Sequence, residues 1–174
     1  MRNAYHAAAL VAAAACFLAQ PASVTPAAAR GEVVPFNGEA SPGTIVVHTN
    51  ERRLYLVLGS GQALRYPVGV GRAGQQWSGQ AVIDGKRIRP AWAPPPDIAR
   101  DNPRLPKVIP GGSPKNPMGV AALTLSGGEY AIHGTNNPGS VGRFVSYGCI
   151  RMYNQDITDL YGRVRVGTPV IVAR

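Results

Sequence analysis

The sequence predicts a mainly β fold, a sandwich or a barrel, with one short helix near the C-terminus. Short runs of β-branched and aromatic residues alternate along the chain with turns rich in Gly, Pro and Asn. The alternation of strands and helices that builds parallel sheets is not seen. A chain of 174 residues also has the length expected of a single domain. These observations favour several short strands packed around one core.

The expected strands follow one another closely. Residues 44–50, 53–59 and 63–70 are separated by short polar or Gly-rich turns, so we expect them to form a meander. Residues 79–90 predict a fourth strand with a turn at Asp84 and Gly85. Gly127 and Gly128 predict a hairpin turn between the next two strands. The remaining expected strands are 120–126, 130–134 and 168–174.

One helix is expected after the last cysteine. Asn154 is a residue type that caps helix N-termini, and the helix should run through Tyr161. Gly162 should end it.

Residues 92–117 predict a long loop. Ten of these 26 residues are proline or glycine, so a long strand or helix does not fit there. A loop of this length in a compact domain is usually functional or disordered. Trp92 and Ile98 within it favour a packed loop, so we expect a lid or a groove wall.

The N-terminus reads as an export signal. Arg2 precedes an apolar run at residues 7–19 that is too short to span a bilayer, and Ala27 to Ala29 form an A-x-A cleavage site. We therefore expect a signal peptide at 1–29, a flexible lead-in at 30–42 and one folded domain at 43–174. A lipidated Cys16 is the rival hypothesis, but Cys16 lies inside the apolar run. The mature protein should be periplasmic or wall-associated, without a transmembrane segment.

The formal net charge is +9, and the expected signal contributes only Arg2 to it. Such a charge favours anionic partners such as carboxylate-rich wall polymers, membrane surfaces or nucleic acid. The basic residues are scattered and form no stripe, so a nucleic-acid partner is not expected.

After removal of the signal, Cys149 is the only cysteine. A lone thiol in an oxidising compartment tends to be either buried or used. His133 lies 16 residues earlier, and a loop rich in Gly, Asn and Ser between them can bring both ends together. A cysteine nucleophile needs such a neighbouring base. A buried cysteine and a core histidine remain the alternative, and His48 has only a structural or surface role in this interpretation.

The neighbours of Cys149 suit acyl transfer. Gly148 has no side chain, so a substrate carbonyl can approach and backbone N–H groups can bind an oxyanion. Arg151 can hold a substrate carboxylate. One cysteine and two histidines without close spacing are poor material for a metal site, so none is expected.

Two motifs carry a resemblance to a known family. "IHGT" at 132–135 and "SYGCIRM" at 146–152 resemble the L,D-transpeptidase catalytic domain of bacterial cell-wall enzymes, and the likeness extends over about residues 43–173. The resemblance implies a β-sandwich or barrel of mixed strands, with Cys149 as nucleophile and His133 as general base and acid. The Gly134 carbonyl would orient the imidazole. Trp92, Ser146, Tyr147 and Arg151 are candidate substrate-binding residues, although Tyr147 stands where many members have His.

The resemblance also implies the substrate and its inhibitors. The donor would be a tetrapeptide stem of peptidoglycan, and loss of its terminal D-alanine would leave a thioester on the cysteine. An amine of a second stem would then form a 3→3 cross-link, without a metal or organic cofactor. Carbapenem β-lactams would acylate the same thiol. A monomer is expected.

Three other functions stay open at this stage. The same acyl-enzyme could pass its acyl group to water, as an L,D-carboxypeptidase, or to a lysine of an outer-membrane lipoprotein. A non-catalytic wall-binding protein is the hypothesis outside the enzyme class, and the presence of both Cys149 and His133 disfavours it.

Overall fold

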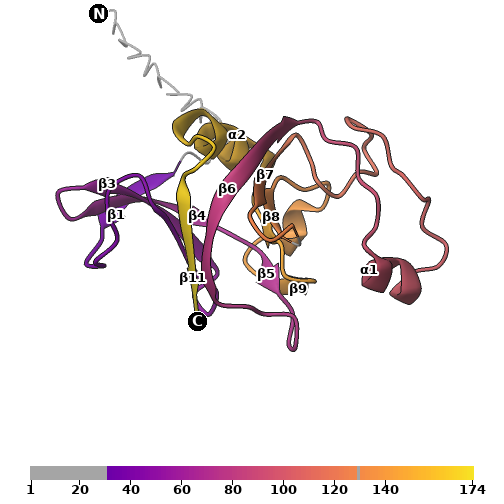
Figure 1. Ribbon diagram of the computed structural model, residues 1–174, viewed down its shortest axis with the longest axis horizontal. Coiled ribbons are helices and arrows are strands. Elements are labelled where there is room, and N and C mark those ends of the chain that lie inside the picture. The colour runs from indigo at the N-terminus through magenta and orange to yellow at the C-terminus, as the bar shows by residue number, and fades with distance from the viewer. Residues whose placement is uncertain (1–30, 129) are drawn as a thin grey trace, which may run out of the picture.

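The protein is mainly β, as the computed structural model shows for residues 31–128 and 130–174 (Figure 1). The expected signal peptide lies outside the described residues. Nine strands form one sheet in the order β1-β4-β3-β2-β11-β6-β7-β8-β10, and β5 and β9 form a second, two-stranded sheet. The strands are β1 (Glu32–Pro35), β2 (Ile45–His48), β3 (Arg53–Gly59), β4 (Gln62–Pro67), β5 (Val70–Gly71), β6 (Gly79–Ile88), β7 (Ala121–Leu125), β8 (Ala131–His133), β9 (Phe144–Ser146), β10 (Ile150–Arg151) and β11 (Pro169–Ala173).

Strands β2, β3 and β4 form the expected antiparallel meander. Alternate residues of β3, Leu54 and Leu56, are buried, as the two-residue period of a half-buried strand requires. Strand β1 pairs with β4 at the edge of the sheet. Part of the lead-in, residues 32–35, is therefore a strand rather than the flexible segment expected from composition. The parallel pairing of β11 with β2 makes the sheet mixed.

Strand β6 connects the two halves of the sheet. Its first half, up to Val82, pairs with β11, and its second half, from Ile83, pairs with β7. The expected turn at Asp84 and Gly85 is wrong, because the strand continues through a bulge at this point. A Cβ at Gly85 would lie 2.6 Å from the Thr124 hydroxyl, so glycine here permits close approach of β7 rather than a reversal of the chain. The hairpin of β7 and β8 around Gly127 and Gly128 is confirmed, and both glycines have positive φ.

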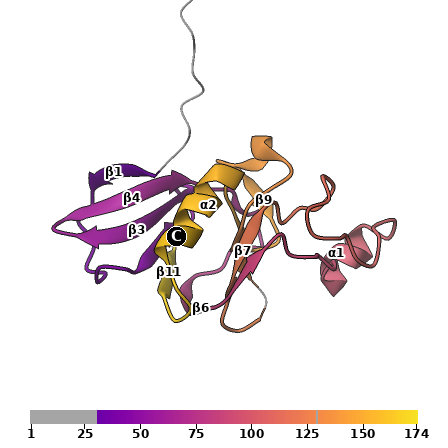
Figure 2. The same cartoon turned by 90° about the horizontal axis from the view of Figure 1, so that it is seen from above.

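Helix α2 (Asn154–Arg163) covers one face of β7 and β8 (Figures 1 and 2). The expected cap is wrong, because Asn154 is already helical and the N-cap residue is Tyr153. The Asn154 side-chain oxygen instead accepts hydrogen bonds from the N–H groups of Val120 and Thr135, at 3.3 and 3.0 Å. The helix therefore ties together two loops beside β8. Its apolar face contributes Ile157 and Leu160 to the core.

The long loop contains a short helix, α1 (Pro96–Asp101), which was not expected. The base of the loop is fixed where Trp92 and Ile109 exchange backbone hydrogen bonds of 2.9 and 2.7 Å. The buried side-chain amide of Asn116 donates to the carbonyls of Pro90, Ile109 and Pro110. Beyond this base, α1 lies at the far end of the molecule in both views (Figures 1 and 2).

Asp156 of α2 offers a prediction on stability. Its side chain is fully buried, and neither carboxylate oxygen has a hydrogen-bond partner in the part of the chain that the structure describes. Burial and the nearby Asp159 raise the pKa of Asp156 to about 6. The folded protein favours the protonated Asp156 side chain. Protonation of Asp156 therefore stabilises the folded state fully below pH 4, and this stabilisation is lost as pH rises through 6.

We expect Asp156→Asn to raise the free energy of unfolding by about 2 kcal/mol at pH 7. Urea titrations from pH 4 to pH 8 should show this advantage disappearing at the acidic end; an equal effect at both ends would contradict it.

Candidate active site

The two candidate catalytic segments meet through the parallel pairing of β8 and β10. The register places Ile132 opposite Ile150 and His133 opposite Arg151. Both isoleucines are buried in the core, so the side chains of His133 and Arg151 lie on the other face of these strands. The pairing is extended on the far side of β10, where Arg151 and Gly69 exchange two backbone hydrogen bonds of 2.8 Å.

Cys149 immediately precedes β10. Continued by one residue, the register puts Cys149 beside Ala131, on the same face as His133. The thiol interacts with the backbone of Ala131 and with the charge of Arg151. The sheet thus gathers Cys149, His133 and Arg151 on one face, although 16 residues separate the thiol from the imidazole in sequence.

Ser146 shapes the turn that presents the thiol. Its hydroxyl donates to the Cys149 carbonyl at 2.6 Å and accepts from the Gly148 N–H at 3.1 Å. The side chain is almost completely buried, with 1% exposed. These contacts are local, so Ser146 is a buried turn residue that fixes the backbone of Gly148 and Cys149.

The backbone conformation and the nearby Tyr130 ring require a glycine at position 148. Its φ is +121°, and a Cβ would lie 2.2 Å from the Tyr130 ring. The Gly148 N–H, which the sequence analysis offered as an oxyanion donor, already donates to Ser146. Its carbonyl accepts from the Trp77 indole at 3.0 Å. The need for glycine therefore comes from backbone conformation and from packing against Tyr130.

Trp77 and Tyr130 form a pair of stacked rings beside Gly148 that no sequence motif indicates. Their rings stack at a centroid distance of 4.9 Å and an interplanar angle of 8°. They lie 53 residues apart in sequence, one before β6 and the other immediately before β8. No local motif contains both, so only the pairing of β6, β7 and β8 brings them together.

A cavity of about 540 Å³ opens at Cys149. Five of its ten described lining residues belong to residues 95–100 of the long loop, which confirms that this loop is a wall of the groove. Tyr147 lines the cavity, but Trp92 and Arg151 do not. Trp92 instead stabilises the base of the loop through its backbone pairing with Ile109. The lining residues are Gln75, Pro95, Pro96, Asp97, Ile98, Arg100, Gly128, Tyr130, Tyr147 and Cys149.

Burial sets the protonation states at the site. Burial and the positive charge of Arg151 lower the pKa of His133 to about 4, so the imidazole is neutral at pH 7. Burial raises the pKa of the Cys149 thiol, although the Ala131 backbone and Arg151 oppose that shift. Burial lowers the pKa of Arg151, and its Nε has no hydrogen-bond partner among the described residues. At pH 7 Cys149 is therefore a protonated thiol and His133 a neutral imidazole.

The Gly134 carbonyl sets the imidazole tautomer. His133 Nδ1 lies 2.6 Å from this carbonyl oxygen, which can only accept, so Nδ1 carries the proton. Nε2 is then the basic nitrogen. This contact with the Gly134 carbonyl is of the kind that the resemblance implies.

Within residues 31–128 and 130–174, no three His, Cys, Asp or Glu side chains are grouped so as to hold a metal ion. In the same residues, no helix has the length and apolar character needed to cross a membrane.

Comparison with known families decides the assignment. A sequence model of the YkuD family, described as the L,D-transpeptidase catalytic domain, matches residues 42–172. The chain belongs to this L,D-transpeptidase family. The match includes both His133 and Cys149, and it confirms the resemblance drawn from the two motifs.

Curated relatives agree with this L,D-transpeptidase assignment. The chain is 40% identical over 133 residues to ErfK/SrfK of Escherichia coli (strain K12), which is named a probable L,D-transpeptidase. It is 39% identical over 136 residues to YbiS of the same strain, which carries the same description. These matches cover 72% of this chain but only 42% and 43% of the relatives, so the chain spans less than half the length of either.

The L,D-transpeptidase fold is also seen in a solved structure. The catalytic domain of the Enterococcus faecium L,D-transpeptidase acylated by ertapenem superposes with a TM-score of 0.58 at 19% identity. The superposition covers 78% of this chain and 100% of that one. At this identity the likeness supports the fold alone.

Proposed function

We propose that this domain is an active L,D-transpeptidase that forms a thioester on Cys149 with the tetrapeptide stem of peptidoglycan. The observation that carries the proposal is the placement of Cys149, His133 and Arg151 on one face of β8 and β10, with the thiol at a cavity. Family membership supports the reaction class. The full activity, the substrate and an exported, periplasmic or wall-bound location are part of the proposal.

In the first half-reaction, a proton passes from the Cys149 thiol to His133. His133 Nε2 takes the thiol proton as Sγ attacks the carbonyl carbon of the third stem residue. The Arg151 charge stabilises the thiolate character that develops on Sγ, because it already interacts with the thiol. The bond to the terminal D-alanine then breaks, its nitrogen receives the proton from His133, and the acyl group remains on Cys149.

The second half-reaction resolves the thioester. An acceptor amine attacks the thioester carbonyl, His133 takes the amine proton, and the thiol is regenerated when that proton passes to sulfur. The cavity volume of about 540 Å³ is within the range that holds small ligands. A relative acylated by ertapenem supports a carbapenem as a covalent inhibitor of this thiol.

The alternative enzymatic functions share the acyl-enzyme and differ only in the acceptor of the acyl group. Purified protein would be incubated with disaccharide-tetrapeptide stems, with and without a lipoprotein C-terminal peptide ending in lysine. We expect D-alanine release and 3→3 dimers by mass spectrometry. Tripeptide alone would assign the protein as a carboxypeptidase, and a peptide-linked stem would assign lipoprotein attachment. Absence of D-alanine release, with folded protein and a reduced thiol, would contradict the acyl-enzyme proposal and favour a wall-binding role.

A further inference from the structure

Helix α1 forms part of the wall of the Cys149 cavity, but few apolar contacts hold this helix in place. None of the residues of α1 is buried, and the helix lies at the far end of the molecule (Figures 1 and 2). The base of the loop is fixed by Trp92, Ile109 and Asn116, but these residues lie outside α1. A short helix without buried side chains needs other contacts to keep one position.

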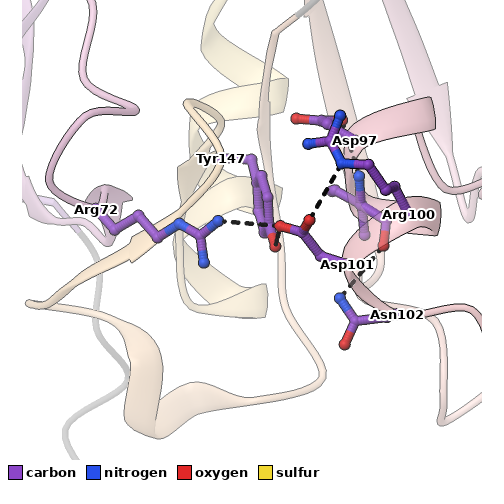
Figure 3. Close-up of polar contacts among 7 residues, drawn as sticks. Arg72, Asp97, Arg100, Asp101, Asn102 and Tyr147 are labelled. Carbon is purple, nitrogen blue, oxygen red and sulfur yellow. Dashed lines mark hydrogen bonds and ion pairs between the residues drawn. The ribbon is translucent and has the colours of Figure 1, made fainter.

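Asp101, the last residue of α1, supplies such contacts. Its Oδ2 accepts a hydrogen bond from the Tyr147 hydroxyl at 2.7 Å, and Arg72 Nη2 lies 3.3 Å from the same oxygen. Arg100 Nε lies 3.5 Å from the other oxygen. Figure 3 shows the carboxylate between Arg72 and Tyr147 on one side and α1 on the other. The Tyr147 hydrogen bond, followed by Arg72, lowers the pKa of the Asp101 carboxyl, so it is charged at neutral pH.

The two residues that hold Asp101 are themselves positioned by the second sheet. Strand β5 pairs with β9 so that Gly71 lies opposite Ser146, and Arg72 and Tyr147 are the next residues of each chain segment. The Arg72 N–H donates to the Ser146 carbonyl at 2.9 Å, and its guanidinium lies 4.0 Å from the Tyr147 ring centroid. Arg72 thus packs against Tyr147, which lies two residues before Cys149.

We propose that Tyr147 is a positioning residue for the acyl donor: with Arg72 it holds Asp101, and so fixes α1 as the donor-binding wall of the Cys149 cavity. This inference rests on the proposed function for its substrate. It gives a role to the tyrosine that replaces the more common histidine of the family motif. The Tyr147 ring lines the cavity, and its hydroxyl is committed to Asp101.

Two single variants test whether the Tyr147 hydroxyl acts by holding Asp101 or by binding the substrate directly. Tyr147→Phe keeps the ring but removes the hydroxyl, and Asp101→Ala removes the acceptor, which does not line the cavity. Each should raise the KM for tetrapeptide donor by about three- to tenfold with little change in kcat, because a hydrogen bond to a charged group is lost. The double variant should be no worse than either single one. Asp101→Asn keeps an acceptor oxygen and should be milder than Asp101→Ala.

Tyr55→Phe is the matched control. It removes a tyrosine–carboxylate hydrogen bond of 2.8 Å to Glu51, remote from the cavity, and should leave KM unchanged. A raised KM in Tyr147→Phe without one in Asp101→Ala would show that the hydroxyl binds substrate directly and would overturn the proposal. Unchanged KM in both variants would also overturn it.

A second measurement does not depend on transpeptidase activity. The amides of Ala99 and Asn102 donate within α1, so hydrogen exchange of peptides covering residues 94–105 reports its opening. Exchange there should be severalfold faster in Tyr147→Phe and Asp101→Ala and unchanged in Tyr55→Phe. Faster exchange in a protein that turns over no stem would support the contact but refute the proposed function; unchanged exchange would refute the contact itself.

Discussion

Replacement of Cys149 by alanine should reduce D-alanine release from tetrapeptide stems by roughly 10⁴-fold or more, as expected when a covalent nucleophile is removed. The thiol is at the cavity, and its backbone is held by Ser146 and by the pairing of β10. No other cysteine is present among the described residues to replace it. The measurement is the initial rate of D-alanine release by a coupled assay.

Alanine differs little from cysteine in size, so the variant should keep its fold. A melting temperature within a few degrees of the wild type would verify this. The control is Ser126→Ala, which alters a small polar residue at the end of β7 and should retain activity. If the Cys149→Ala protein still released D-alanine at a rate comparable to the wild type, the covalent mechanism would be wrong.

Replacement of His133 by glutamine should lower kcat/KM by about 10² to 10⁴-fold, the usual contribution of a general base. In the wild type, the base is active when neutral, and the pKa of His133 is about 4. The acidic limb of the kcat/KM profile should therefore lie near pH 4 rather than near 6.5. The rate should fall as pH drops through that value, because protonation of Nε2 removes the acceptor for the thiol proton.

His48→Gln is the matched control for this prediction. His48 lies on β2 and packs edge-on against Tyr55, remote from Cys149. Its replacement should leave both the rate and the acidic limb unchanged. Undiminished activity of His133→Gln would remove His133 from the role of base. An acidic limb near pH 6.5 in the wild type would contradict the lowered pKa of the buried imidazole.

Much of the sheet could be predicted from local patterns. In β3 the buried Leu54 and Leu56 flank the half-buried Tyr55, and Gly127 and Gly128 adopt the positive φ expected of the turn. Local patterns failed where tertiary contacts decide the structure. Gly85 indicates a turn in sequence but lies in a bulge, because it is pressed against Thr124 of β7. Asn154 indicates a cap but bonds to two loops instead.

Some residues of the candidate site could likewise be predicted from the sequence, and others could not. Cys149 and His133 could be found because each lies in a short motif, and the pairing of β8 with β10 brings those motifs together. Trp77 and Asp101 could not be found, since each acts through a residue distant in sequence, Gly148 and Tyr147 respectively. The sequence makes Trp92 a candidate substrate-binding residue, yet in the structure it does not line the cavity and its backbone pairs with Ile109.

The acyl-enzyme itself is the central claim, and intact-protein mass spectrometry after incubation with a carbapenem tests it most directly. We expect a mass increase equal to one carbapenem on the wild-type protein, mapped by peptide analysis to Cys149 and absent from Cys149→Ala. An unmodified mass, measured on folded protein whose thiol is reduced and reacts with iodoacetamide, would contradict the account.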